Sequence, residues 1–237
     1  MAVACGYGHT ALVLDDGEAL LFGNNCYGQC ALPAERLRGR RVAQAACGWR
    51  HTALVLADGE ALLFGAANDE GQCALPAERL RGRRVAQAAC GWWHTALVLA
   101  DGEALLFGAN CYGQCALPAE RLRGRRVAQA ACGGYHTALV LADGEALLFG
   151  RNDEGQCALP AERLRGRRVA AQASAPEEAP RPPAGSAAAA ARGLRASAAD
   201  EARRRRGRSV SCGKMPSCQR APGRWRWSGA TTTASWP

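Results

Sequence analysis

The chain has 237 residues, twelve of them cysteine, and a formal net charge of +9. Residues 1–173 carry 18 Arg against 17 acidic residues, so the positive excess lies in residues 174–237. We therefore expect no nucleic-acid binding by the first three quarters of the chain, and at most weak contact through the basic tail. No run of eighteen apolar residues occurs, so no membrane-spanning helix is predicted.

The first three quarters of the chain repeat one sequence four times. The stretch ACGWRHTALVLADGEALLFG, residues 46–65, has near copies that begin at residues 4, 89 and 131. Periods of about 40 residues indicate a solenoid or a propeller. We divide residues 1–173 into four tandem repeats at about 2–45, 46–88, 89–130 and 131–173.

Each repeat predicts the same short elements, described here for the second. A strand at RRVAQAAC comes first, followed by HTALVL and EALLF, which flank Asp58-Gly59 and therefore predict a tight hairpin. A fourth short strand is expected at QCAL and one helical turn at AERLR, between Pro76 and Gly82. Consecutive apolar residues indicate strands buried on both faces. The prediction is an all-β chain of propeller blades with about four strands each, as a partial or open ring.

Residues 174–237 have a different composition, rich in Ala, Pro and Arg and poor in large apolar residues. Such a segment cannot bury enough apolar surface to fold, so we predict a disordered tail. Its run RRRRGR, residues 203–208, is typical of a nuclear-localisation or anion-binding patch, although this composition also produces such runs by chance.

The repeated motifs resemble those of the regulator of chromosome condensation (RCC1-like) repeat family. They are Gly-x-x-His-Thr, Asp-Gly-Glu, Phe-Gly and Asn-x-x-Gly-Gln, within residues 2–173. The resemblance implies a β-propeller, which has seven blades in that family. This chain has only four compact repeats, and Gly-Gln-Cys-Ala replaces the usual Gly-Gln-Leu-Gly. Since the chain also enters its first repeat at once, we expect a fragment of a larger protein.

The family includes a Ran nucleotide-exchange factor, HECT ubiquitin ligases, the plant UV-B receptor and secreted bacterial inhibitors. The resemblance therefore implies a non-enzymatic module for protein interaction, with a protein partner of unknown identity and no membrane. Two alternatives stay open: the substrate-binding part of a HECT-type E3 ubiquitin ligase, and a guanine-nucleotide exchange factor for a small GTPase. A third is a repeat array without a specific partner.

Large aromatic residues and an arginine occupy the two positions before the repeated His. Equivalent positions in consecutive blades are neighbours in space, and adjacent Trp and Arg are typical of binding hot spots. Packing between blades is the alternative use for at least half of these rings. The predicted partner-binding residues are Trp49, Arg50, Trp92, Trp93 and Tyr135.

The sequence Arg-Leu-Arg-Gly-Arg-Arg also occurs once in each repeat. Equivalent positions lie on one side of stacked blades, so these residues predict a basic arc, balanced by the Asp-Gly-Glu hairpins and suited to acidic partners or phosphates. A solvated surface without a function is the alternative. The arc comprises Arg38, Arg40, Arg41, Arg81, Arg83, Arg84, Arg123, Arg125, Arg126, Arg165, Arg167 and Arg168.

The four histidines are predicted to be structural, each at the start of a strand and hydrogen-bonded to the backbone of its own blade. No catalytic set can be assembled without occurring four times, so no enzyme and no cofactor are predicted. These residues are His9, His51, His94 and His136.

Ten of the cysteines occupy repeated positions or lie beside them. Because no secretory signal opens the chain, we interpret them as free thiols in a reducing compartment, the cytoplasm or the nucleus. The pairs Cys26/Cys30 and Cys111/Cys115 offer two zinc ligands each, but the other two repeats lack such a pair. No metal site is therefore predicted.

Overall fold

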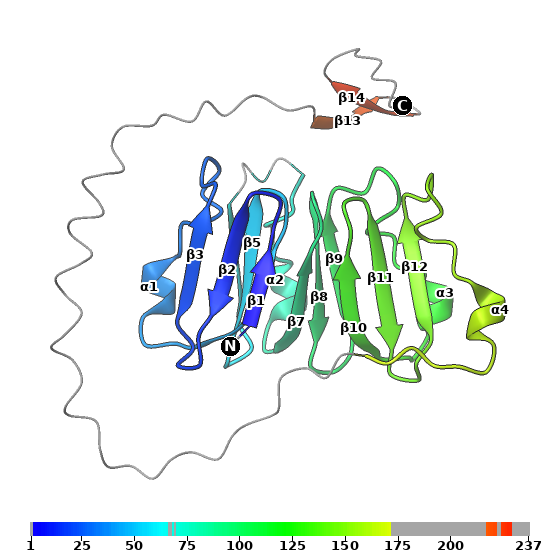
Figure 1. Ribbon diagram of the computed structural model, residues 1–237, viewed down its shortest axis with the longest axis horizontal. Coiled ribbons are helices and arrows are strands. Elements are labelled where there is room, and N and C mark those ends of the chain that lie inside the picture. Colours follow the sequence, from blue (N-terminus) through cyan, green and yellow to red (C-terminus); the bar gives the residue numbers. More distant parts are fainter. Residues whose placement is uncertain (1, 66–67, 69, 172–216, 222–223, 229–237) are drawn as a thin grey trace, which may run out of the picture. The chain divides into compact units, whose positions relative to one another are not determined.

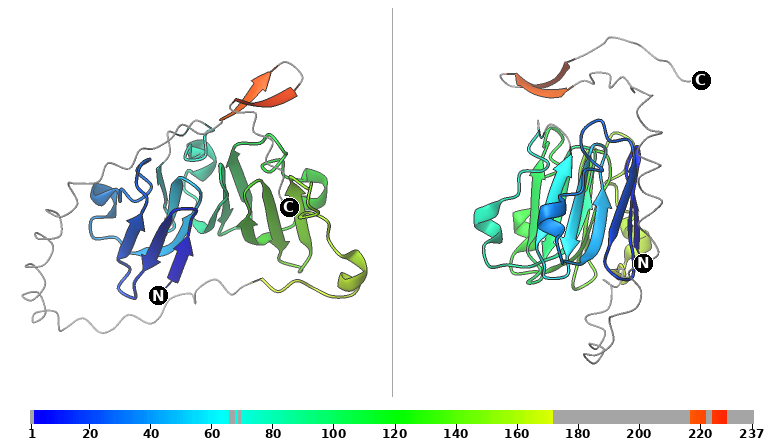
Figure 2. Two further views of the ribbon diagram at one scale, coloured as in Figure 1. Left: turned by 45° about the horizontal axis from the view of Figure 1, so that its top comes forward. Right: turned by 90° about the vertical axis from the view of Figure 1, so that its left-hand side faces the viewer.

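The computed structural model describes residues 2–65, 68, 70–171, 217–221 and 224–228. The repeats form four three-stranded antiparallel sheets, in each of which a strand pairs with the next one along the chain. Figures 1 and 2 show these sheets side by side in chain order, from blue to yellow-green, as an open array with the first and fourth at opposite ends. The prediction of propeller blades in an open ring is confirmed.

The strands begin and end at equivalent residues of each repeat. The first sheet consists of β1 (Ala2–Cys5), β2 (His9–Val13) and β3 (Ala19–Gly23). The second consists of β4 (Val42–Cys47), β5 (His51–Leu56) and β6 (Ala61–Gly65). The third consists of β7 (Val85–Cys90), β8 (His94–Leu99) and β9 (Ala104–Gly108). The fourth consists of β10 (Val127–Cys132), β11 (His136–Leu141) and β12 (Ala146–Gly150).

The expected fourth strand at Gln-Cys-Ala-Leu is wrong for the described residues, because this stretch forms a turn. In the second repeat the Cys73 amide donates to Asn68 Oδ1 at 2.7 Å, and the Ala74 amide donates to the Gly71 carbonyl at 3.0 Å. An amide that is bonded within a turn cannot join a sheet ladder. The turn formed by the Asn and Gly of the repeated motif therefore prevents a fourth strand, and each blade has three.

The Asp-Gly sequences form the predicted hairpins. Between β5 and β6 the Leu56 amide donates to the Glu60 carbonyl at 2.9 Å, and the Gly59 amide donates to the Leu56 carbonyl at 2.8 Å. Gly59 has φ +87°, a backbone conformation that residues other than glycine rarely adopt. The loop is therefore the three-residue type that ends in a left-handed glycine.

The predicted helical turn is present in every repeat. Each turn has the sequence Ala-Glu-Arg-Leu and follows a proline, whose fixed φ suits the start of a helix. The turns are α1 (Ala34–Leu37), α2 (Ala77–Leu80), α3 (Ala119–Leu122) and α4 (Ala161–Leu164). The first three turns, α1 to α3, lie between consecutive sheets along the chain, and α4 follows the fourth sheet.

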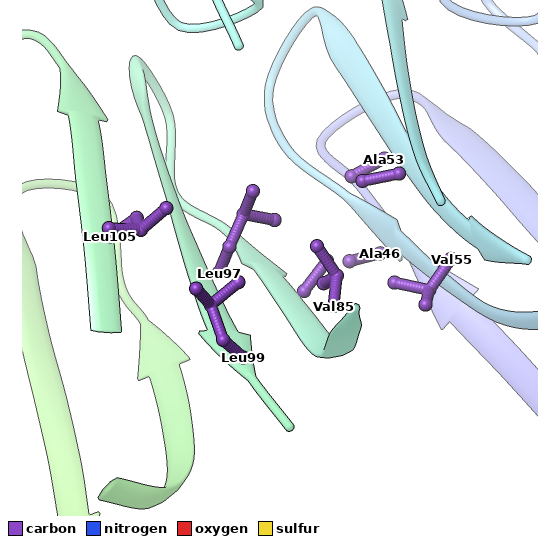
Figure 3. Close-up of a cluster of buried hydrophobic side chains, with 9 residues drawn as sticks. Ala46, Ala53, Val55, Val85, Leu97, Leu99 and Leu105 are labelled. Carbon is purple, nitrogen blue, oxygen red and sulfur yellow. The ribbon is translucent and has the colours of Figure 1, made fainter. Parts of the chain in front are cut away.

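The hydrophobic core lies between consecutive sheets. Figure 3 shows the interface of the second and third sheets, where Leu97, Leu99 and Leu105 of the third lie against Ala53 and Val55 of the second. The same residue types recur at the two other interfaces. Burying a leucine contributes about 1.5–3 kcal/mol relative to leaving it exposed. Contacts between repeats therefore hold the array together.

The predicted disorder of residues 174–237 lies almost wholly outside the described residues, as does the RRRRGR patch. The described part of this segment is β13 (Ser217–Ala221) and β14 (Arg224–Ser228), an antiparallel hairpin that the prediction did not include. Trp and Arg alternate in β14, and this period-two pattern with aromatic residues favours a strand. No helix among the described residues is long and apolar enough to cross a membrane.

Candidate functional site

The Gly-x-x-His turns joining the first and second strands of each sheet carry the predicted binding residues. In the second repeat the Gly48 amide donates to the His51 carbonyl at 2.9 Å and closes the turn. A Cβ at Gly48 would lie 2.4 Å from His51 Cε1 and 2.5 Å from the Gly91 carbonyl oxygen. Only glycine leaves room for the imidazole and the neighbouring turn, which brings the middle residues of successive turns close together.

Three of the four histidines, His9, His51 and His94, bind the next repeat and not their own. His51 lies 3.0 Å, through Nε2, from Thr95 Oγ1, and that hydroxyl donates to the Gln72 carbonyl at 2.9 Å. Because the Thr95 hydroxyl proton is used in the bond to Gln72, the hydroxyl oxygen can only accept from the histidine. Nε2–H of the imidazole therefore donates to Thr95. His9 and His94 make the same contact with the threonine of the following repeat. The structural role is thus as predicted, but the expected bond to the blade's own backbone is wrong.

Burial keeps these imidazoles neutral. His51 and His94 are fully buried, and desolvation lowers the pKa of His51 to about 3 and that of His94 to about 4. The pKa of His9 is also lowered, again chiefly by burial. A neutral imidazole whose Nε2–H is already bonded is poorly suited to acid–base chemistry at neutral pH.

Rings from successive turns make a continuous cluster across the repeats. The ring centroids of Tyr7 and Trp49 lie 5.5 Å apart, those of Trp49 and Trp92 5.0 Å, and those of Trp92 and Tyr135 5.3 Å. We call these rings, together with Trp93, the aromatic row. The tilted and edge-to-face contacts are those that aromatic pairs prefer. The structure therefore brings all four predicted aromatic site residues together.

The structure divides the predicted site by exposure. Trp93 and Tyr135 are each only 8% exposed and pack between repeats, so they do not face outward as expected. Trp49 and Arg50 are half-buried, and Trp92 is 41% exposed. Trp92 also lies against Gly134, where a Cβ would be 3.1 Å from its ring. The next repeat therefore supports this exposed ring from one side.

Two tyrosines that the sequence analysis did not single out complete the cluster. The Arg50 guanidinium lies 4.1 Å from the centroid of Tyr27 and 5.0 Å from that of Trp93. Tyr112 packs on Tyr135 with centroids 5.3 Å apart. Both tyrosines stand in the Cys-Tyr-Gly loops of the first and third repeats, so their recurrence was the signal that could have found them.

Half of the twelve arginines of the predicted basic arc are ion-paired, so the arc is not a continuous free cationic surface. Arg40 binds Asp58 at 2.5 Å and Glu60 at 2.6 Å, both in the hairpin of the next repeat. Arg83 and Arg125 make equivalent pairs one and two repeats further on. Arg36, Arg79 and Arg121, which stand one helical turn earlier, also bind the next repeat's glutamate.

The other arginines of the arc pair within their own helical turn, donate to a backbone carbonyl or have no ion pair among the described residues. Arg38, Arg81 and Arg123 each pair with the glutamate three residues earlier. Arg41 donates to the Asp15 carbonyl at 2.7 Å, and Arg84 and Arg126 make equivalent bonds. In the fourth repeat Arg168 packs on Gly144. Arg165 and Arg167 have no ion pair among the described residues.

Grooves between the hairpins and the helical turns also recur along the array. One of them, about 630 Å³, is lined by Arg36, Arg40, Asp58, Glu60 and residues of the second helical turn. Similar grooves lie in the first and fourth repeats. Because their charged side chains are largely bonded to one another and the groove is repeated, none is distinguished as an active site.

No group of three or more His, Cys, Asp or Glu side chains in the described part of the chain is arranged to hold a metal ion. Nine cysteines there are free, as interpreted from the sequence. Cys26 is disulfide-bonded, so that interpretation is wrong for this residue. Burial raises the pKa of Cys115 and that of Cys132 to about 12, which makes these thiols poor nucleophiles.

Three stretches match the model of the regulator of chromosome condensation (RCC1) repeat: residues 2–29, 85–114 and 127–156. They lie in the first, third and fourth repeats. No curated protein matches the chain.

Solved structures with a similar fold include three structures of two RCC1-like proteins. Human WBSCR16 is 24% identical with a TM-score of 0.58, over 66% of this chain and 49% of that one. Prp20p from Saccharomyces cerevisiae, described with its binding to Gsp1p and histones, is 19% identical with a TM-score of 0.55, over 67% and 46%. Yeast RCC1 (Prp20) bound to Kap60 is 19% identical with a TM-score of 0.56, over 71% and 47%. This chain thus spans about half the length of each.

Proposed function

Because the chain is a repeat protein of the RCC1 type, we propose that it is a non-enzymatic module that binds another protein through the aromatic row, with Trp92 at the centre of the contact. The observation that carries this proposal is the exposure of Trp92. Its neighbours in the row lie on both sides of it, and yet 41% of its surface faces solvent.

The surroundings of Trp92 favour tight binding. The ring is held by Trp49 and Tyr135 and lies against Gly134, so little side-chain entropy remains to be lost when a partner covers it. Half-buried Trp49 lies beside it, and the Arg50 guanidinium lies 5.1 Å from the centroid of Trp49. Exposed Trp surrounded by Trp, Tyr and Arg is the composition of binding hot spots. The partner predicted by this chemistry is a protein that presents an apolar or acidic side chain to the row.

The repetition of every polar motif supports a module without catalysis. The repeated histidines and hairpin carboxylates occur once in each repeat, and at the internal interfaces they are bonded to the neighbouring repeat. The four copies stand in four different sheets and do not converge on one site. A catalytic centre needs different groups at one place.

The binding of Prp20p to Gsp1p and histones makes these two ligands the defined probes for this chain. Binding of Gsp1p would favour the alternative of an exchange factor for a small GTPase. The other alternative, the substrate-binding part of a HECT-type ubiquitin ligase, predicts binding of other proteins at the same row. Localisation in the cytoplasm or nucleus stays a prediction.

The test compares two adjacent tryptophans. We expect Trp92→Ala to weaken binding at least about 30-fold, or about 2 kcal/mol, with an unchanged melting temperature. Trp93→Ala should lower stability by about 3–5 kcal/mol, because this ring is buried. Affinities are measured by titration with Gsp1p, with histones and with any purified protein captured by the wild-type chain.

Captured proteins that bind Trp92→Ala as tightly as wild type would refute the assignment of the site. A fall in melting temperature equal to that of Trp93→Ala would show that Trp92 serves packing instead. The Trp93→Ala variant is therefore the matched control for a merely structural effect.

A further inference from the structure

Each internal contact between repeats joins two different faces. The later sheet contributes a face of large apolar residues, and the earlier sheet contributes a face of smaller ones. Between the second and third sheets these are Leu97, Leu99 and Leu105 on one side and Ala53 and Val55 on the other (Figure 3). The array repeats this pairing three times.

In the described part of the chain, no sheet packs against the large-residue face of the first sheet. Buried and partly exposed residues alternate along β2, and the partly exposed ones include Thr10 and Leu12. Leu20 is 40% exposed and Phe22 50%, whereas Leu62, which corresponds to Leu20, is 1% exposed in the second sheet.

No sheet formed by the described residues packs against the small-residue face of the fourth sheet. Burial alternates along β11 in the opposite phase, so His136, Ala138 and Val140 are the partly exposed residues. Their counterparts Ala53 and Val55 in the second sheet are 0% and 3% exposed. The two ends of the array are therefore the two halves of the contact made at every internal interface.

The charges at the two ends are complementary as well. Within the array, the arginine pair of each helical turn binds the Asp and Glu of the next hairpin. In the fourth repeat the corresponding arginines are Arg163 and Arg167, and in the first repeat the acidic residues are Asp16 and Glu18. None of these four residues has an ion pair within the described ranges of the chain.

The hydrogen-bonding groups at the two ends match in the same way. Each internal threonine accepts a hydrogen bond from the histidine of the preceding repeat. The same hydroxyl donates to a carbonyl in the Gly-Gln turn of that preceding repeat. Among the described residues, no histidine bonds to Thr10 and no threonine bonds to His136 in this way. A Thr10 placed against the fourth repeat would find His136 and the Gln156 carbonyl in the equivalent positions.

We propose that these two ends bind each other between copies: the fourth repeat of one chain docks on the first repeat of a second copy, head to tail. Apolar shape, charge and hydrogen bonding all favour this one occupant. Two copies provide eight repeats, within the range of blades found in propellers. The reciprocal contact then closes the pair, so the assembly is a dimer with two identical interfaces.

The experiment measures the mass of the full chain in solution under reducing conditions, over a series of concentrations. The monomer mass is 24.9 kDa, and we expect a species of twice that mass. The variant Asp16→Lys/Glu18→Lys reverses the acidic end, and Arg163→Glu/Arg167→Glu reverses the basic end. Each variant alone should be monomeric, because like charges then face each other at both interfaces.

Mixing the two variants provides the decisive measurement. A lysine-bearing first repeat matches a glutamate-bearing fourth repeat, and the remaining interface keeps its wild-type charges, so the mixture should regain the dimer. This rescue also shows that both variants are folded. The control Glu35→Arg/Arg38→Glu reverses an exposed pair within one helical turn and should stay dimeric.

A wild-type chain that is monomeric at every concentration would overturn the proposal. So would a dimer that persists in both charge-reversed variants, a mixture that stays monomeric, or an open series of longer assemblies.

Discussion

At the scale of single residues, the side chains of the Gly-x-x-His-Thr motif form hydrogen bonds between neighbouring repeats. The glycine leaves space for the imidazole, the imidazole donates to the threonine of the next repeat, and that threonine donates back to a carbonyl of the preceding one. All three groups are withdrawn from water. The buried polar chain therefore specifies how one blade sits on the next, because a shifted blade would leave these groups unbonded.

The buried histidines predict that stability falls with pH from about 6.5 downward. The unfolded chain binds a proton near the ordinary pKa of 6.5, whereas folded His51 does so only near 3. Within this window the unfolded state holds more protons, so stability is lost as pH falls, by about 1.4 kcal/mol per pH unit for one histidine. Urea unfolding between pH 7 and pH 5 measures this slope before most carboxylates titrate.

The variant His51→Gln should make the slope shallower by that amount, whatever its stability at pH 7. Thr95→Val is the control, because it removes the hydrogen bond but keeps the titrating imidazole. A slope that is the same in His51→Gln and wild type would contradict the assignment to this residue.

At the scale of elements, identical strands have different burial because of their place in the array. The sequence HTALV stands in β2, β5, β8 and β11, but only β5 and β8 are buried along their whole length. The two internal strands have a sheet on each side. Burial here depends on neighbouring repeats and not on the strand's own residues.

Leu105 provides the prediction for the interface between sheets. It is 1% exposed and belongs to the core between the second and third sheets. Leu105→Ala should lower the unfolding free energy by about 2–5 kcal/mol, and Leu105→Met by less than about 1.5 kcal/mol because it keeps the volume. Chemical denaturation followed by tryptophan fluorescence measures both.

The matched position in the first repeat is Leu20, which has the same neighbours in sequence and is 40% exposed. In the Arg163→Glu/Arg167→Glu chain, which we expect to be monomeric, Leu20→Ala should cost about 0.5 kcal/mol. Equal losses at Leu20 and Leu105 would mean that packing between sheets does not determine stability.

At the scale of the whole molecule, the repeats form a one-dimensional array in which each sheet packs on its neighbours in sequence. The stability of such arrays is approximately the sum of repeat and nearest-neighbour terms. Internal repeats have two such neighbours, and the first and fourth have one each. The ends are therefore expected to open before the middle.

Native-state hydrogen exchange on the same monomeric variant checks this order. We expect the slowest exchange for amides of β5 and β8 and faster exchange for β2 and β11, because opening an end repeat breaks one interface and opening the middle breaks two. Uniform protection across all four sheets would instead indicate that the array unfolds as a single unit. In the wild-type chain, the proposed dimer should slow exchange at both ends.

The sequence by itself determined the Asp-Gly hairpins and the Pro-led helical turns, because each depends on local backbone preferences. The predicted repeat boundaries fall inside β4, β7 and β10, so each sheet begins a few residues before its predicted repeat. The sequence also determined that the rings of successive turns meet, since equal positions in consecutive blades are neighbours. It missed the tail hairpin and predicted a fourth strand, because hydropathy did not reveal that the Asn side chain binds the Cys amide in that turn.

Only the tertiary structure decided which side chains are free. Trp92 and Trp93 are adjacent and chemically identical, yet 41% of one is exposed and 8% of the other. The direction of each ring depends on the neighbouring turn, where Gly134 admits Trp92 and Tyr135 lies against its edge. The arginines looked like one basic surface until the next repeat's hairpin was placed beside each of them. The exposure of these rings and the pairing of these arginines depend on contacts between repeats, which a local sequence pattern does not contain.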